Sequence, residues 1–230
     1  MRSEWLHRHN APILFVFFNG WSMDCRPLAP LAAQNCDVLV VSDYRNLDLD
    51  WDLAGFSASY DRTVVIAWSM GVWAAQKVLV EQKSLFHSAL AVNGTLCPLH
   101  DHFGIPPAIF AATRQQFDET ARLKFYRRMC RKKEILSTFV AHQPVRTLDD
   151  QLAELIVLES LVDCHPVEGS IYDRVLISDQ DYIMPTENQR AFWQNGQGRL
   201  VQEIAAPHFP FYRWASWEEL LTETGGVNHA

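Results

Sequence analysis

Short apolar runs rich in Val, Ile and Phe recur along the chain, separated by polar or helical stretches. Near-continuous hydrophobicity is typical of strands buried on both faces, which occur where helices cover both sides of a parallel sheet. The pattern therefore predicts an α/β fold with a mostly parallel central sheet flanked by helices. The predicted strands are Ile13–Phe18, Asp37–Val41, Thr63–Ala67, Ala89–Val92, Arg174–Ile177 and Leu200–Ile204, with helices at Ser69–Lys83 and Thr186–Trp193.

The strand pattern is interrupted over residues 98–166, where no comparable apolar run is found. Helical, charge-rich segments such as Phe117–Lys133 and Leu148–Leu161 replace it. We interpret this segment as a helical lid inserted after a strand. No repeat, low-complexity tract or linker indicates a second domain, so we expect residues 1–230 to form one domain that contains the lid.

Composition and charge narrow the classes of function. A chain of 230 residues with 48% apolar residues can bury one sizeable core. Its formal net charge of −7 argues against a general nucleic-acid-binding surface, because phosphate affinity comes mainly from clustered Lys and Arg. The run Ile13–Phe18 is too short to span a membrane, and no signal-peptide cleavage site follows it. We therefore expect a cytoplasmic monomer without nucleic-acid or membrane partners.

The cysteines indicate neither a metal site nor a disulfide framework, because they are odd in number, widely spaced and without zinc-ligand spacing. They are Cys25, Cys36, Cys97, Cys130 and Cys164. We expect ordinary cytosolic thiols and no metal or other cofactor. The small, polar tail from Gly225 to Ala230 is expected to fray.

A serine lies at the junction between a predicted strand and a predicted helix. The segment Thr63–Ala75 runs from an apolar strand through Ser69 into an Ala-rich helix, which is the setting of a nucleophile elbow. Such a sharp turn needs small residues two positions on either side of the serine. Gly71 supplies one, and Ala67 replaces the usual glycine on the other, so the motif is AxSxG. Ser69 is a candidate nucleophile, and a purely structural N-cap is the alternative.

The turn after the first predicted strand contains Asn19, Gly20 and Trp21. A glycine-bearing turn here would lie beside the elbow. It would offer the backbone N–H of Trp21, which could pair with that of Met70 to form an oxyanion hole. An ordinary strand-to-helix turn is the alternative.

Titratable side chains follow the last two predicted strands, and the carboxyl ends of parallel strands are where α/β enzymes assemble their sites. Asp181 is the candidate acid, with Asp179 as its competitor. His208 is the candidate base, and His142 and His165, in or beside the lid, are the alternatives. The order serine, aspartate, histidine along the chain is that of α/β-hydrolases.

One segment of the lid is strongly cationic and contains no acidic residue. Lys124, Arg127, Arg128 and Arg131 recur at helical spacing and would form one face. We interpret this face as a docking site for an acidic partner or a phosphate-bearing substrate, and a solvated helix surface is the alternative. The cations are Arg122, Lys124, Arg127, Arg128, Arg131, Lys132 and Lys133. The nearby apolar side chains, which would line an acyl channel or form the lid core, are Phe103, Ile109, Phe110 and Phe125.

Several segments resemble the BioG type of pimeloyl-acyl-carrier-protein methyl ester esterase, an α/β-hydrolase family of biotin synthesis. They are Phe18–Trp21, Asp43–Arg45, Ala67–Trp73, Val92–Thr95 and Gly104–Phe110. The last two are the most specific, because general hydrolases do not share them. The AxSxG elbow is also similar to the family's own form.

The resemblance implies an α/β-hydrolase fold and a serine esterase with Ser69, Asp181 and His208 as its triad. The substrate would be the methyl ester at the far end of a pimeloyl chain on acyl carrier protein, and the products methanol and a free carboxylate. The cationic lid would hold the acidic carrier and its phosphopantetheine arm. Two other functions stay open: a general carboxylesterase or thioesterase acting on small esters, and a binding protein that keeps the fold without the chemistry.

Overall fold

A central sheet organises the computed structural model, which describes residues 1–225 apart from 50, 195 and 197. Within these residues the sheet has seven strands in the order β1-β3-β2-β4-β5-β6-β7. β1 runs antiparallel to β3, and every other pairing is parallel. The strands are β1 (Arg2–His7), β2 (Ile13–Phe18), β3 (Cys36–Ser42), β4 (Arg62–Trp68), β5 (Ser88–Val92), β6 (Arg174–Gln180) and β7 (Leu200–Pro207). The predicted α/β fold and its mostly parallel sheet are confirmed, and β1 is an additional strand.

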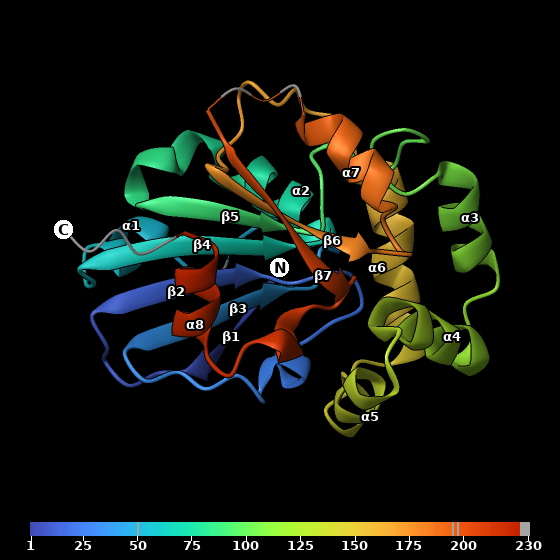
Figure 1. Ribbon diagram of the computed structural model, residues 1–230, viewed down its shortest axis with the longest axis horizontal. Coiled ribbons are helices and arrows are strands. Elements are labelled where there is room, and N and C mark those ends of the chain that lie inside the picture. The colour runs from blue at the N-terminus through green and yellow to red at the C-terminus, as the bar shows by residue number, and fades with distance from the viewer. Residues whose placement is uncertain (50, 195, 197, 226–230) are drawn as a thin grey trace.

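Helices cover both faces of the sheet (Figure 1). Phe18 of β2 shares a core cluster with Trp73 of α2, while its neighbour Phe17 packs on the opposite face against Trp217 of α8, with ring centroids 5.3 Å apart. The helices outside the lid are α1 (Leu53–Ser57), α2 (Met70–Leu79), α7 (Thr186–Trp193) and α8 (Trp217–Glu223), with short 3-10 turns at Arg26–Leu28, Val80–Leu85 and Phe211–Arg213. Burial on both faces explains the near-continuous apolar runs.

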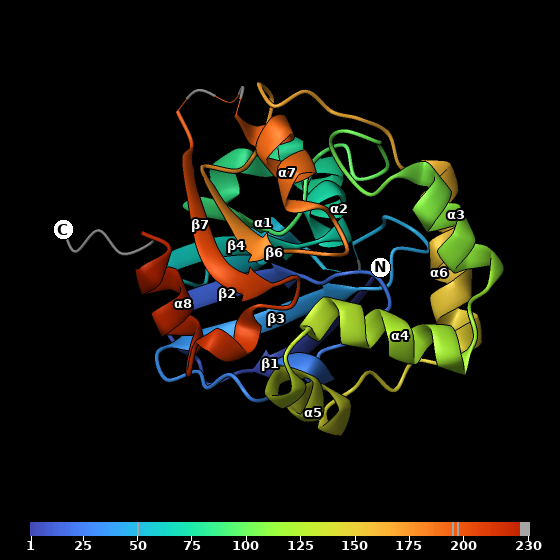
Figure 2. The same ribbon diagram turned by 45° about the vertical axis from the view of Figure 1, so that its right-hand side comes forward.

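Residues 98–166, the proposed lid, contain helices α3 to α6 and lie beyond the carboxyl ends of the parallel strands (Figures 1 and 2). These helices are α3 (Pro107–Gln115), α4 (Glu119–Cys130), α5 (Lys133–Ala141) and α6 (Leu148–Leu161). Side-chain caps set the starts of two of them: Asp118 accepts from Ala121 N at the start of α4, and Thr147 accepts from Asp150 N at the start of α6.

Two helix boundaries differ from the prediction. The segment Phe117–Lys133, expected to be helical, contains α4 over Glu119–Cys130 and the first residue of α5, because Arg131 adopts a left-handed backbone with φ 60° and separates the two helices. The helix expected over Ser69–Lys83 is α-helical only over Met70–Leu79, and a 3-10 turn continues it. Neither break is marked by Gly or Pro, the residues that usually signal a helix end in a sequence.

The expectation of free thiols is wrong for two cysteines, since Cys97 and Cys164 form a disulfide. They flank the lid at its two ends and are separated by 67 positions, so the folded lid brings together residues whose spacing carries no such signal. Cys25, Cys36 and Cys130 are free.

Within the described part of the chain, no helix is long and apolar enough to cross a membrane. Of the tail that was expected to fray, residues 226–230 lie outside the described residues.

Candidate active site

Ser69 lies in a sharp turn between the end of β4 and the start of α2. Its backbone has φ 57° and ψ −124°, a strained conformation for a residue with a side chain, and its hydroxyl makes no capping hydrogen bond to the helix. Strain of this kind persists only where surrounding structure fixes it. The hydroxyl is therefore free for another partner, which speaks against the simple N-cap interpretation.

Small residues around Ser69 allow two backbone segments to meet. A Cβ atom on Gly71 would lie 2.3 Å from the carbonyl oxygen of Phe18 and 2.5 Å from that of Asn19. Ala67, on the other side of the serine, is completely buried. The start of α2 thus packs directly on the loop that follows β2, which is the steric reason for the AxSxG pattern.

His208 bridges Ser69 and Asp181 by hydrogen bonds. Its Nε2 lies 3.0 Å from Ser69 Oγ, and its Nδ1 lies 2.6 Å from Asp181 Oδ2. All three side chains are at least nine-tenths buried. A serine, an imidazole and a carboxylate in this order can activate the hydroxyl as a nucleophile and stabilise the imidazolium that forms.

The carboxylate of Asp181 is held by several donors besides His208. Its Oδ1 accepts from Ile183 N and Met184 N, both at 2.9 Å, and its Oδ2 accepts from Gln189 Nε2 at 2.8 Å. The competitor Asp179 is exposed and accepts from Ala206 N at 3.2 Å. The structure therefore joins Asp181, and not Asp179, to His208.

The two alternative histidines lie away from Ser69. His142 interacts through Nδ1 with Thr138 O at the end of α5, at 2.9 Å. His165 pairs with Asp163 beside the disulfide, with 2.9 Å between Nε2 and Oδ1. Neither lines the pocket that contains Ser69 and His208.

Asn93 and Trp68 position His208, and sequence reasoning assigned neither of them this role. The backbone oxygen of His208 accepts from Trp68 Nε1 at 2.8 Å and from Asn93 Nδ2 at 2.9 Å. Asn93 also donates to Ser178 Oγ at 2.8 Å and accepts from Ser178 N at 2.7 Å. Two signals in the sequence pointed to Asn93: its place directly after a buried strand and its place in the family-like segment Val92–Thr95.

Trp21 and Met70, the predicted oxyanion-hole residues, both line the pocket beside Ser69. Met70 is the first residue of α2, and the first N–H groups of a helix have no partner within it. A Cβ on Gly20 would lie 2.8 Å from the Trp68 ring, so only glycine lets this loop approach the elbow. The loop after β2 and the start of α2 thus lie close together beside Ser69, as the predicted oxyanion hole requires.

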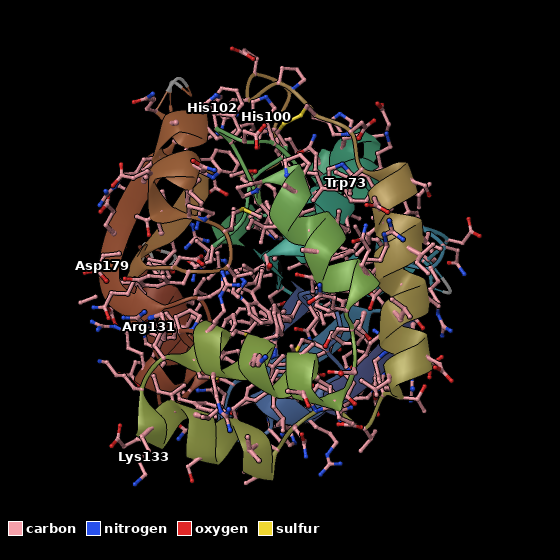
Figure 3. The ribbon with its side chains drawn as sticks, turned by 90° about the vertical axis from the view of Figure 1, so that its right-hand side faces the viewer. Trp73, His100, His102, Arg131, Lys133 and Asp179 are labelled. Atoms are coloured by element: carbon pink, nitrogen blue, oxygen red, sulfur yellow. A yellow bond between two sulfur atoms is a disulfide. The ribbon has the colours of Figure 1, made fainter. Side chains whose placement is uncertain are left out.

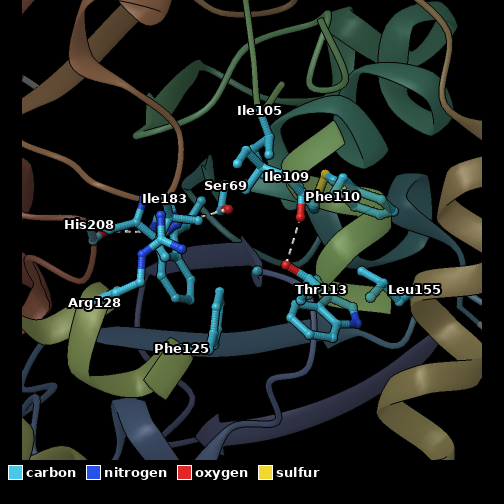
Figure 4. A pocket seen from close by; sticks show the side chains of 14 residues that line it. Ser69, Ile105, Ile109, Phe110, Thr113, Phe125, Arg128, Leu155, Ile183 and His208 are labelled. Atoms are coloured by element: carbon cyan, nitrogen blue, oxygen red, sulfur yellow. Dashed lines mark hydrogen bonds between the residues drawn. The ribbon is translucent and has the colours of Figure 1, made fainter. Parts of the chain in front are cut away.

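A mostly apolar pocket opens over Ser69 (Figure 4). Three of the four apolar side chains proposed for an acyl channel line it, namely Ile109, Phe110 and Phe125. Phe103 does not line this pocket: it stacks on His100 with ring centroids 4.7 Å apart, in a separate pocket beside the disulfide, and packs against the core cluster that contains Phe110, in line with the lid-core alternative. Arg128 is a pocket residue as well as one of the predicted lid cations.

The cationic segment forms an exposed surface over α4 and the start of α5, and Figure 3 shows Arg131 and Lys133 at its edge. Arg122 is the exception, being half-buried and paired with Glu119. Arg128 donates to Tyr182 O at 2.8 Å, and the Arg131 guanidinium lies 3.8 Å from the centre of the Tyr182 ring. The remaining exposed cations are Lys124, Arg127, Lys132 and Lys133.

Known proteins similar to this chain share this architecture. A family model described as pimeloyl-ACP methyl esterase BioG matches residues 1–220. The crystal structure of BioG from Haemophilus influenzae has a TM-score of 0.83 and 33% sequence identity, with 95% of this chain and 98% of that chain covered. An uncharacterised protein of H. influenzae is 36% identical over 211 residues, which are 90% of this chain and 93% of that protein.

A longer protein also matches. A malonyl-[acyl-carrier protein] O-methyltransferase of Bacteroides fragilis is 36% identical over 179 residues, or 78% of this chain. The chain spans only 36% of the length of that protein.

Proposed function

Because the chain belongs to the BioG family of pimeloyl-ACP methyl esterases, we propose that it is a serine esterase that hydrolyses the methyl ester of a pimeloyl chain on acyl carrier protein, in biotin synthesis. The observation that carries the proposal is the chain of hydrogen bonds from Ser69 Oγ through His208 to Asp181. The proposal includes a cytoplasmic location.

In the first half-reaction, Ser69 Oγ attacks the ester carbonyl and passes its proton to His208 Nε2. Asp181 holds the imidazole through Nδ1 and stabilises its charged form. The backbone N–H groups of Trp21 and Met70 would donate to the tetrahedral oxyanion, and each donor of this kind is worth about 3–4 kcal/mol to the transition state. His208 then returns the proton to the departing methoxide, which leaves as methanol.

In the second half-reaction, water attacks the acyl-enzyme. His208 takes a proton from the water and later returns it to Ser69 Oγ, which releases the free carboxylate. The net reaction consumes one water, and no redox change occurs. The apolar walls at Ile109, Phe110 and Phe125 suit the methylene chain that precedes the ester.

The cationic surface of α4 and α5 supports a carrier-bound substrate. In a protein with a net charge of −7, these exposed cations would attract an acidic carrier protein and the phosphate of its arm. Arg128 belongs both to this surface and to the pocket, so the two are continuous. The matching B. fragilis protein is named for a reaction on a malonyl-[acyl-carrier protein], which supports an acyl carrier protein as the partner.

The decisive experiment compares hydrolysis of the carrier-bound and the free methyl pimeloyl ester at low and high salt. We expect a lower KM for the carrier-bound ester at low salt and loss of this advantage at high salt, because exposed charges are screened. Equal and salt-insensitive rates would favour a general esterase. Ser69→Ala should abolish both turnover and labelling by a fluorophosphonate. If the wild-type protein forms no fluorophosphonate adduct on Ser69, the esterase proposal fails and the alternative of a non-catalytic binding protein remains.

Charge reversal of the lid surface tests the carrier contact itself. Lys124→Glu with Arg127→Glu should raise KM for the carrier-bound ester roughly tenfold or more, since two exposed pairs of about 1 kcal/mol each would become repulsive. Turnover of a small free ester should stay nearly unchanged. Arg8→Glu with Lys83→Glu is the matched control, because both cations lie outside the lid and the net charge changes equally. Equal effects of the two double variants would contradict carrier docking at α4.

Complementation of a biotin auxotroph that lacks this esterase, with wild type and Ser69→Ala, tests the role in the cell. Because reducing compartments disfavour disulfides, titration of thiols in protein purified without reductant tests the proposed cytoplasmic location. Reduced Cys97 and Cys164 would agree with that location, whereas the disulfide seen in the structure, if it is present in protein alkylated at cell lysis, would argue against it.

A further inference from the structure

The lid helix α6 holds the loop that carries the predicted oxyanion donor. Trp21 Nε1 donates to the backbone oxygen of Gln151 at 2.8 Å, and Gln151 Nε2 donates to the backbone oxygen of Ser22 at 3.1 Å. Ser22 N in turn donates to Glu154 Oε2 at 3.1 Å. The residue whose N–H would face the oxyanion is thus tied to α6 through its own side chain and through its neighbour.

Glu154 is completely buried, and both of its oxygens accept hydrogen bonds. Besides Ser22 N, they accept from Tyr44 N at 2.9 Å and from Arg146 Nη1 at 2.6 Å. Burial raises the pKa of this carboxyl, while Arg146 and the two backbone N–H groups act to lower it. A buried carboxylate destabilises a fold unless hydrogen bonds and an opposite charge compensate it. The three donors to Glu154 supply that compensation and fix the orientation of its side chain.

The two N–H groups that Glu154 accepts belong to turns of unusual backbone conformation. Ser22 has φ 75°, and Asp43, which immediately precedes Tyr44, has φ 64°. Left-handed backbone at residues with side chains persists only where other contacts fix it. One carboxylate from the lid therefore fixes the loops after β2 and after β3 together.

We infer that Glu154 and Gln151 are positioning residues of the esterase, which hold the Trp21 N–H in the place where it meets the oxyanion. The inference rests on the proposed serine-esterase chemistry, but not on the identity of the carrier. It assigns the lid a part in building the active site in addition to covering it.

The first variant is Glu154→Gln, which keeps the volume but places an amide N–H₂ where an acceptor is needed. We expect kcat on a small oxygen ester to fall about tenfold to a hundredfold, with KM changed less than about threefold, because only the oxyanion is bound less well. Glu159→Gln is the matched control: it makes the same chemical change on the same helix, where Glu159 pairs with Arg114 of α3. This control should leave kcat unchanged.

A thionoester separates positioning from a general loss of structure. Sulfur accepts hydrogen bonds weakly, so an intact oxyanion hole favours the oxygen ester, and a displaced donor should lower the oxygen-to-thiono rate ratio. A merely structural role would lower both rates by one factor and leave the ratio unchanged. Gln151→Met, which removes the hydrogen bond to Ser22 without changing the charge, should also lower the ratio, and it decides the question if Glu154→Gln does not fold.

The outcomes distinguish the two proposals. If wild type hydrolyses neither the small ester nor the carrier-bound ester, the proposed function fails and this inference fails with it. If wild type hydrolyses the small ester but both variants keep the wild-type ratio, the positioning role of α6 is refuted while the esterase stands.

Discussion

Asn93 offers the sharpest test of how the fold holds His208, the proposed catalytic base. Its backbone is left-handed with φ 47°, and its buried side chain joins the end of β5 to Ser178 of β6 and to the backbone of His208. Replacement by Gly keeps the backbone conformation free of strain but removes these hydrogen bonds. Replacement by Ala removes the same bonds and adds the cost of a left-handed residue.

The structure sets the size of both effects. Asn93→Gly leaves Ser178 N without this partner and the carbonyl oxygen of His208 with Trp68 Nε1 as its remaining donor. At about 1–3 kcal/mol for each of the two buried groups, we expect a loss of about 2–6 kcal/mol of unfolding free energy. Asn93→Ala should lose up to about 1.6 kcal/mol more, because a left-handed alanine costs about 1–2 kcal/mol, whereas the greater unfolded-state entropy of glycine costs the Gly variant about 0.4–1 kcal/mol. Loosening of His208 should lower kcat roughly tenfold or more.

Denaturant unfolding of both variants, with Asn10→Gly and Asn10→Ala as controls, measures these quantities. Asn10 shares the left-handed backbone, with φ 58°, but it is exposed. The difference in unfolding free energy between the Ala and the Gly variant should therefore be similar at the two positions. Both Asn93 variants should be strongly destabilised, whereas Asn10→Gly should stay close to wild type. An Asn93→Gly protein within about 0.5 kcal/mol of wild type would refute this account of the His208 loop, since surface substitutions alone reach that size.

Two further substitutions test the elbow and the acid. Asp181→Asn should lower kcat about 10⁴-fold, because an amide N–H₂ opposite His208 Nδ1 favours the wrong tautomer of the imidazole. The control Asp179→Asn should leave steady-state kinetics near wild type. Equal losses of kcat in the two variants would refute the assignment of Asp181 as the acid. Gly71→Ala should destabilise the protein by about 1–3 kcal/mol, because the new Cβ would collide with the carbonyl oxygen of Phe18. It should also lower kcat, because it pushes α2 away from the loop after β2. Thermal unfolding measures the first effect and steady-state kinetics the second.

The parallel strands could be predicted because burial on two faces leaves an unambiguous apolar signal. β1 carries a weaker one: its sequence mixes Arg2, Ser3 and Glu4 with Trp5, and most of its residues are half-buried at the edge of the sheet. An antiparallel edge strand with one partner needs no continuous apolar run. The break at Arg131 was equally hidden, because a left-handed arginine leaves no mark in composition.

The active-site residues likewise divide into those that the sequence predicts and those that only the folded structure shows. Ser69, Asp181 and His208 follow strands that are recognisable in the sequence, so their proximity follows from parallel topology alone. The roles of Asn93, Trp68 and Glu154 depend on which backbone groups they meet after folding. In the sequence, Glu154 cannot be distinguished from the other acidic residues of a predicted helix. Only the packed structure shows that it is completely buried.

The contacts of the lid constrain how a substrate can reach Ser69. Since α6 holds Trp21 and Ser22 through Gln151 and Glu154, a movement of α6 away from the sheet would disrupt the proposed oxyanion hole. The two ends of the lid are also joined by the disulfide, and α3 is tied to α6 by an ion pair. We therefore expect substrate to enter without displacement of α6, at the pocket edge formed by Arg128 of α4, which is itself one of the exposed cations.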